Sequence, residues 1–210
     1  NILNPATHSL ITTVTEDYQS GIDIKVTHAK AAQKLLAAVP LSDRIGILNK
    51  FSELLHTNIQ NCAHVLTSEV GKPIQQSINE INGACIRIEW LTENASTYLQ
   101  DEWMVATGAT REKIVYEPLG IICNISAWNY PYLVGTNVFV PALLAGNAIL
   151  YKPSELATLT GLEIQKYLHA AGVPEKVFQV VIGGKQAGEL LVNADLDGYF
   201  FTGSYATGKY

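Results

Sequence analysis

The chain has 210 residues and a net charge of −5, with 48% apolar and only 16% charged residues, and its mean hydropathy is +0.13. This length can bury a sizeable core in one or two domains. The acidic balance, without a basic cluster, argues against nucleic acid as a partner. The longest uncharged stretch, 118–151, is interrupted by Asn and Pro residues. It is typical of a buried strand–helix–strand unit, so no membrane association is expected.

The cysteines point to a reducing compartment. Cys62, Cys85 and Cys123 are an odd number, and neither they nor the five histidines show metal-ligand spacing. Disulfide frameworks of secreted proteins use paired cysteines instead. No signal peptide is recognised at the start of the chain. A cytoplasmic protein without a metal site is therefore expected.

The first half of the chain predicts short strands followed by helices. Residues 10–14 alternate weakly after a turn at Asn4-Pro5. Helical periodicity follows from 21 to about 99, with Ser42 as the expected N-cap of a helix over 43–58. Gly71-Lys72-Pro73 is expected to end one helix, and a long helix with an apolar inner face begins after it.

The second half predicts a hairpin and then alternating strands and helices. Residues 103–117 resemble a β-hairpin around Gly108, and Arg111, Glu112 and Lys113 suit an exposed arm. Strands are expected at 120–126, 148–151, 177–182 and 198–202, with helices between them. This alternation predicts an α/β fold with a parallel, Rossmann-like sheet and flanking helices. The expected parts are an N-terminal segment (1–102), the hairpin (103–117) and the Rossmann-like core (118–210).

Polar residues follow the first two core strands. Asn129 comes after the first, and Lys152, Ser154 and Glu155 come after the second. Parallel α/β sheets bind ligands at this carboxyl edge. The Asn129 amide could donate to an oxyanion, although an Asn before Tyr-Pro could also simply shape the turn. Lys152 and Glu155 could bind a ribose, or they could be surface charges at a helix start capped by Ser154.

Glycine-rich segments follow the last two strands. The run Gly183-Gly184-Lys185-Gln186-Ala187-Gly188 is a weak dinucleotide-binding pattern, and its glycines could serve tight turns alone. The run from Phe201 to Gly208 contains the spacing of a phosphate-binding P-loop as far as Lys209. Tyr210 stands where that motif requires Ser or Thr for magnesium, which argues against it.

Five motifs, in this order, together resemble the aldehyde dehydrogenase family over essentially the whole chain. They are NPAT (4–7), E-x-GKP (69–73), EPLG (117–120), WNYP followed by GN and KPSE (128–155), and FTGS-x-x-x-G (201–208). The family usually has Thr after the FTGS serine, where this chain has Tyr205. The chain also has Asn137 where several subfamilies place an aromatic residue facing the substrate tunnel.

The resemblance implies a role for each motif. It implies that Asn129 binds the oxygen of a cysteine thiohemiacetal and that the adenosine ribose lies at Lys152, Ser154 and Glu155. Glu155 favours NAD over NADP, because a carboxylate repels a 2′-phosphate. The implied cofactor-binding set also includes the strand-end and glycine-rich positions Ile125, Ser126, Ala127, Trp128, Gly184, Gly188, Phe201, Thr202, Gly203, Ser204 and Thr207.

The resemblance further implies NAD(P)-dependent oxidation of an aldehyde to a carboxylate, in a homodimer or homotetramer joined through the hairpin. The family's nucleophilic cysteine and general-base glutamate fall downstream of these 210 residues, so this stretch alone is expected to be inactive. Cys123 lies six residues before Asn129, but an inert, packed thiol is the expected role for it.

Three alternatives remain open at this stage. A scaffold that binds a nucleotide without catalysis would keep the fold, and a P-loop phosphate binder would use the last glycines. An acylating dehydrogenase that releases an acyl-CoA would use the same cofactor site.

Overall fold

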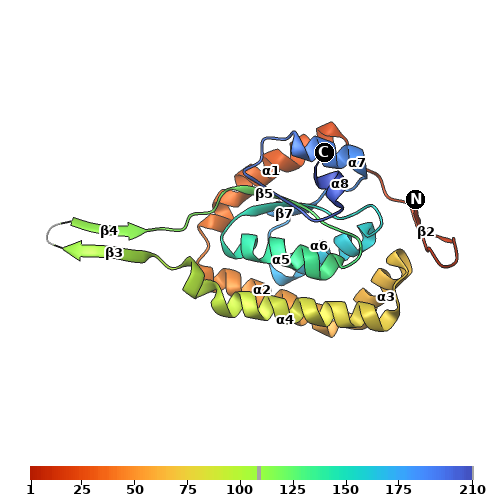
Figure 1. Ribbon diagram of the computed structural model, residues 1–210, viewed down its shortest axis with the longest axis horizontal. Helices are drawn as coiled ribbons and strands as arrows, with labels where there is room; N and C mark the ends of the chain where they lie inside the picture. Colours follow the sequence, from red (N-terminus) through yellow and green to blue (C-terminus); the bar gives the residue numbers. More distant parts are fainter. Residues whose placement is uncertain (108–109, 210) are drawn as a thin grey trace.

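The computed structural model describes residues 1–107 and 110–209 (Figure 1). The predicted hairpin turn at Gly108 lies outside the described residues. The chain opens with a small antiparallel pair, β1 (Ile2–Leu3) and β2 (Leu10–Thr12). The remaining strands form the antiparallel pair β3 (Glu102–Thr107) and β4 (Thr110–Ile114), and the main sheet of β5 (Ile121–Ile125), β6 (Ala148–Lys152), β7 (Phe178–Val180) and β8 (Gly198–Phe201).

The N-terminal half is helical, as predicted. Its helices are α1 (Gln19–Ala37), α2 (Leu41–Thr57), α3 (Ile59–Val70) and α4 (Ile74–Leu99). Gly71 ends α3 with φ of 83°, and a Cβ there would lie 2.7 Å from Pro5 Cγ. Only glycine therefore fits this corner. The α3–α4 corner, residues 69–80, turns the chain so that α4 packs against α2, α3 and α5.

The predicted N-cap of α2 is wrong. The helix begins at Leu41 and is preceded by Pro40, so Ser42 already lies inside its first turn. The Ser42 hydroxyl bonds to Asp43 Oδ1 at 3.2 Å instead of to a helix N–H group. Proline fixes an extended entry to the helix without a side-chain cap, which the serine pattern does not reveal.

The main sheet is parallel, and its strands run in the order β7-β6-β5-β8. The helices α5 (Pro131–Leu144), α6 (Thr158–Ala171), α7 (Lys185–Val192) and the short α8 (Tyr205–Gly208) follow the four strands in turn. The alternation predicted from 120 onward is therefore confirmed. β7 is shorter than the predicted 177–182: Val181 N still bonds to Tyr151 O at 2.8 Å, whereas Ile182 N bonds to Asp17 Oδ2 at 2.8 Å.

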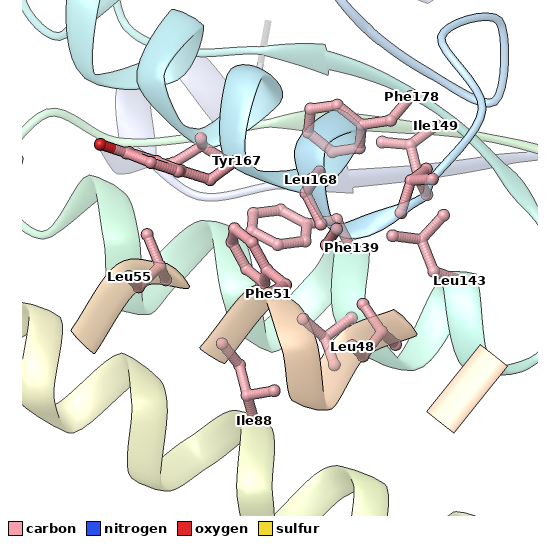
Figure 2. Close-up of a cluster of buried hydrophobic side chains, with 14 of the residues drawn as sticks. Leu48, Phe51, Leu55, Ile88, Phe139, Leu143, Ile149, Tyr167, Leu168 and Phe178 are labelled. Carbon is pink, nitrogen blue, oxygen red and sulfur yellow. The ribbon is translucent and has the colours of Figure 1, made fainter. Parts of the chain in front are cut away.

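Helices cover both faces of the sheet. Figure 1 shows α1 and α7 on one side and α5 and α6 on the other, with α2 and α4 outside them. Successive residues of β5 enter different cores: Ile121 and Cys123 pack with α1 and α7, whereas Ile122 faces the larger core. Phe139 lies in that larger core against Phe51 and Phe178 (Figure 2).

The β3–β4 pair extends away from the body of the molecule (Figure 1). Its side chains at Trp103, Met104 and Ile114 are exposed, as are the charged residues predicted for an arm. An exposed apolar ribbon of this kind is typical of an interaction surface. No helix within the described residues has the length and apolarity that a membrane span requires.

Candidate functional site

The strand order creates one reversal point in the sheet. From β5 the chain moves outward to β6 and β7, and it then returns to place β8 on the other side of β5. The carboxyl ends of β5 and β8 therefore flank the point where the winding changes direction. Open α/β sheets bind ligands in the crevice at such a point.

The pairing of β5, β6 and β8 places five of the predicted site residues side by side at the carboxyl ends of these strands. Ile125 pairs with Lys152 on one side and with Phe201 on the other. Just beyond, Ser126 N bonds to Lys152 O, and Thr202 N bonds to Ile125 O, each at 3.0 Å. The ends of β5, β6 and β8 thus form one continuous edge, from which Ala127 and Trp128 lead onward.

Lys152 is buried, with only 5% of its surface exposed. The interpretation of Lys152 as an ordinary surface charge is therefore wrong. Burial lowers the pKa of its ammonium, and the neighbouring Glu155, Cys123 and Glu16 oppose that shift. Within the described part of the chain, its one hydrogen bond goes to Pro153 O at 3.3 Å. An ammonium has three N–H donors, so this site retains capacity for the hydroxyl groups of a ligand.

The turn after Lys152 differs from the expected helix start. α6 begins at Thr158, and Ala157 occupies its N-cap position, so Ser154 does not cap it. Instead, Ser154 Oγ accepts from Leu156 N at 3.3 Å within a tight turn. This extra turn separates the motif from the helix and leaves the Glu155 carboxylate exposed at the edge of the site.

The start of α7, which follows the glycine pair after β7, packs against Lys152 through Gly188. Gly184 directly precedes α7, and a Cβ on Gly188 would lie 3.7 Å from Lys152 Cε. Gly183 has φ of 149°, and a Cβ there would lie 2.7 Å from Ala187 Cβ. Gly183 is the position with the strict glycine requirement, and sequence reasoning missed it although the Gly-Gly pair was visible.

The loop after β8 is built around an aromatic ring. Cβ atoms on Gly203 and Gly208 would lie 2.5 and 3.0 Å from the Phe201 ring. An open pocket here is lined by Phe201, Thr202, Gly203, Ser204, Tyr205, Gly208 and Lys209. Thr207 is outside that lining, and its N–H instead donates to Ser204 Oγ at 3.2 Å. The glycine spacing is explained by the ring it accommodates, which argues against a P-loop.

Asn129 lies on the exposed turn between β5 and α5. Its Oδ1 accepts from Tyr130 N at 3.1 Å, which leaves the amide nitrogen as the donating group of the side chain. The Asn129 carbonyl accepts from Lys72 Nζ at 2.5 Å, and the same ammonium lies 4.3 Å from the centre of the Tyr130 ring. Sequence reasoning did not connect Lys72 to this turn, because the two are far apart in the chain.

The packing predicted for Cys123 is confirmed. Cys123 is fully buried in β5, and burial raises its pKa to about 12. A thiol with so high a pKa is protonated at neutral pH and is a poor nucleophile.

A doubly wound parallel sheet with polar groups at its reversal point defines an open α/β protein, a class whose ligands bind at that point. The model of the aldehyde dehydrogenase family matches residues 1–210, and the chain belongs to that family. The predicted membership and fold are thereby confirmed.

The chain is also similar to individual dehydrogenases. The chain is 34% identical over 188 residues to an N-succinylglutamate 5-semialdehyde dehydrogenase of Novosphingobium aromaticivorans, covering 87% of this chain and 39% of the relative. It is 32% identical over 207 residues to a probable NADP-dependent succinate-semialdehyde dehydrogenase of Synechocystis, covering 98% of this chain and 45% of the relative. The chain thus spans less than half the length of these relatives.

Solved structures share the fold over nearly the whole chain. A structure of PnpE in complex with nicotinamide adenine dinucleotide superposes with a TM-score of 0.94 at 27% identity, covering 99% of this chain and 43% of that one. A succinate-semialdehyde dehydrogenase from Burkholderia pseudomallei gives 0.92 at 30% identity, covering 99% and 44%.

Proposed function

We propose that this chain forms the cofactor-binding part of an NAD(P)-dependent dehydrogenase that oxidises an aldehyde to a carboxylate. The observation that carries the proposal is the buried Lys152 ammonium, which has unused N–H donors at the edge of the sheet reversal. Burying a charge is costly unless polar partners compensate, and the hydroxyl groups of a ribose would supply them. The complex of the PnpE relative with nicotinamide adenine dinucleotide supports this choice of cofactor.

Three segments of this chain would bind the cofactor and the substrate oxygen. Lys152 would donate to the ribose hydroxyls, and the exposed Glu155 would accept from them. The Phe201–Ser204 loop would border the rest of the cofactor, which accepts a hydride when bound. Asn129 would donate from its amide nitrogen to the substrate oxygen and stabilise the negative charge that develops there. The family resemblance implies that the thiol and the general base lie downstream of these residues, and the buried Cys123 would not supply that thiol.

The direct test uses the full-length protein, titrated with NAD and with NADP and then assayed for NADH or NADPH formation with a panel of aldehydes. Binding of a cofactor with turnover of an aldehyde supports the proposal. Binding without turnover of any aldehyde would favour a nucleotide-binding scaffold, and strict dependence on CoA would indicate an acylating dehydrogenase. Failure to bind either cofactor would overturn the proposal.

Glu155 is expected to set the cofactor preference. Glu155→Gln should weaken NAD binding several-fold, on the order of one charged hydrogen bond, and should narrow the preference for NAD over NADP, because it removes the charge that repels a 2′-phosphate. Fluorescence titration of the full-length protein with both cofactors measures the two dissociation constants. Glu175→Gln, at an exposed position away from the site, is the matched control. An unchanged ratio of the two constants would show that Glu155 only shapes its turn.

The substrate is proposed to be an aldehyde that carries a carboxylate, as the semialdehydes named for both curated relatives do. Tyr130, Val134 and Asn137 recur along one face of α5 from the Asn129 turn. Arg87 Nε donates to Asn137 Oδ1 at 2.8 Å at the far end of this face. No carboxylate within the described residues pairs with Arg87. Its remaining guanidinium donors suit a substrate carboxylate.

Replacing this arginine provides the test. Arg87→Gln should raise KM for succinate semialdehyde by about tenfold or more, the loss expected for a charged hydrogen bond, and should leave KM for butanal nearly unchanged. Steady-state kinetics of the full-length protein with both aldehydes measure the difference. Arg111→Gln, on the exposed arm, is the control. A parallel rise for both aldehydes would refute carboxylate recognition by Arg87.

We further propose a homodimer or homotetramer assembled through the β3–β4 arm, whose exposed Trp103, Met104 and Ile114 offer an apolar surface. The three free cysteines fit a reducing, cytoplasmic location. We also propose the division into the segments 1–102, 103–117 and 118–210. The arm lies between the other two segments, and both of these contribute side chains to one hydrophobic core.

A further inference from the structure

The α3–α4 corner holds two buried carboxylates. Glu69 lies near the end of α3 and is 5% exposed, and Glu80 lies in the second turn of α4 and is 3% exposed. Acidic side chains are almost never buried this deeply without partners. Both reach across to the amino ends of helices that follow strands of the main sheet.

Glu80 reaches the turn that carries Asn129. Its Oε1 accepts from Tyr132 N at 2.8 Å, in the first turn of α5. Its Oε2 accepts from Lys72 Nζ at 2.5 Å, and the same ammonium donates to Asn129 O at 2.5 Å. Glu80 and Lys72 thus hold the turn on both sides of Tyr130-Pro131.

Glu69 makes the equivalent contacts at the other turn. Its Oε1 accepts from Leu159 N at 2.7 Å, and its Oε2 accepts from Thr160 N at 2.9 Å and from Thr160 Oγ1 at 3.0 Å. These groups lie in the first turn of α6, which Leu156 and Ala157 separate from the segment from Lys152 to Glu155. Glu69 therefore holds the helix that follows the proposed ribose site.

Both helices depend on these distant carboxylates for capping. The first N–H groups of a helix have no partners within the helix, and they favour negative charge. Neither Tyr130 nor Ala157, the N-cap residues of α5 and α6, supplies a side-chain cap. Burial raises the pKa of both carboxyl groups, while the backbone N–H donors, and Lys72 at Glu80, oppose that rise. A cap from another layer also fixes where the helix lies relative to that layer, which a local cap cannot do.

We infer that Lys72 and Glu80 are positioning residues for Asn129, and that Glu69 is the positioning residue for the segment from Lys152 to Glu155. One corner of the helical layer then sets the geometry of the oxyanion turn and of the cofactor turn separately. The inference rests on the proposed function for the roles of the two turns, but the contacts themselves can be tested without any activity.

The first experiment is hydrogen exchange, read by mass spectrometry, on the full-length protein and its Glu80→Gln and Glu69→Gln variants. Loss of a charged hydrogen bond should speed exchange about tenfold or more at the amides it protects. Glu80→Gln should act on peptides that contain Tyr132, and Glu69→Gln on those that contain Leu159 and Thr160. Glu93→Gln, exposed on α4, is the control and should alter neither. Equal changes at both turns, or no change at either, would overturn the inference.

The second experiment separates kcat from cofactor binding in the same variants. Glu80→Gln should lower kcat about tenfold or more with little change in the NAD dissociation constant, and Glu69→Gln should raise that constant by a similar factor. If Glu80→Gln does not fold, Lys72→Gln takes its place in this experiment. It removes the hydrogen bond to Asn129 O and keeps the bond from Tyr132 N to Glu80. A merely structural role would change both quantities together, which would refute separate positioning. If no aldehyde is turned over, the proposed function fails, whereas the exchange pattern still decides the inference.

Discussion

Replacing Asn129 by alanine is expected to lower kcat of the full-length enzyme by about 10²–10³, the usual cost of removing one oxyanion donor. The amide oxygen is already bound to Tyr130 N, so the nitrogen is the group that can donate to the substrate oxygen. Because the backbone carbonyl of Asn129 holds Lys72, the turn itself should survive the substitution. Steady-state kinetics with a saturating aldehyde and NAD measure the effect.

The matching control distinguishes chemistry from folding. Asn49→Ala, at an exposed position on α2, should leave kcat unchanged. The NAD dissociation constant of the Asn129→Ala variant should also stay near the wild-type value, since Lys152 and Glu155 are untouched. If kcat were unchanged, Asn129 would serve only the turn, which is the alternative that an Asn before Tyr-Pro leaves open.

Replacing Phe139 by alanine is expected to have the largest effect on stability, about 3–5 kcal/mol of the free energy of unfolding. Figure 2 shows its ring at the centre of the larger core, and its centroid lies 6.3 Å from Phe51, 5.7 Å from Tyr151 and 5.3 Å from Phe178. All three contacts are edge-to-face, a favourable geometry that alanine cannot replace. The cavity would lie where α2, α5 and the sheet meet.

Urea unfolding of the full-length protein, followed by circular dichroism, measures this loss. Phe200→Ala is the control, because the Phe200 side chain is 47% exposed and its removal leaves no buried cavity. A loss below about 1 kcal/mol for Phe139→Ala would mean that the core relaxes to fill the space, contrary to the close packing expected of protein interiors.

The local signals in the sequence predicted most of the elements. Apolar runs separated by glycines indicated the four core strands, and the polar residues that end them lie together because parallel strands share one carboxyl edge. Strand order was beyond this reasoning, since nothing local in residues 198–201 indicates that β8 returns to the other side of β5.

Local backbone geometry and contacts between layers account for what sequence reasoning missed. Ser42 and Ser154 have the composition of helix caps, but a preceding proline and an extra turn move the helix starts away from them. Lys152 was predicted to bind the cofactor, but its burial was not predicted: it is 5% exposed, and a Cβ on Gly188 of α7 would lie 3.7 Å from its Cε. Glu69 and Glu80 read as ordinary helical glutamates, and only the three-dimensional arrangement shows which distant amides they cap.

The remote caps also constrain how the molecule folds. Glu80 precedes the Tyr132 amide it binds by 52 residues, and Glu69 precedes those of Leu159 and Thr160 by 90 and 91. Closing such long loops is entropically costly, and domains dominated by distant contacts fold slowly. The helices that carry the two carboxylates precede α5 and α6 in the chain, so these carboxylates gain their partners only once α5 and α6 have formed. Both turns of the site therefore depend on contacts between segments far apart in the chain, and local folding alone cannot complete either turn.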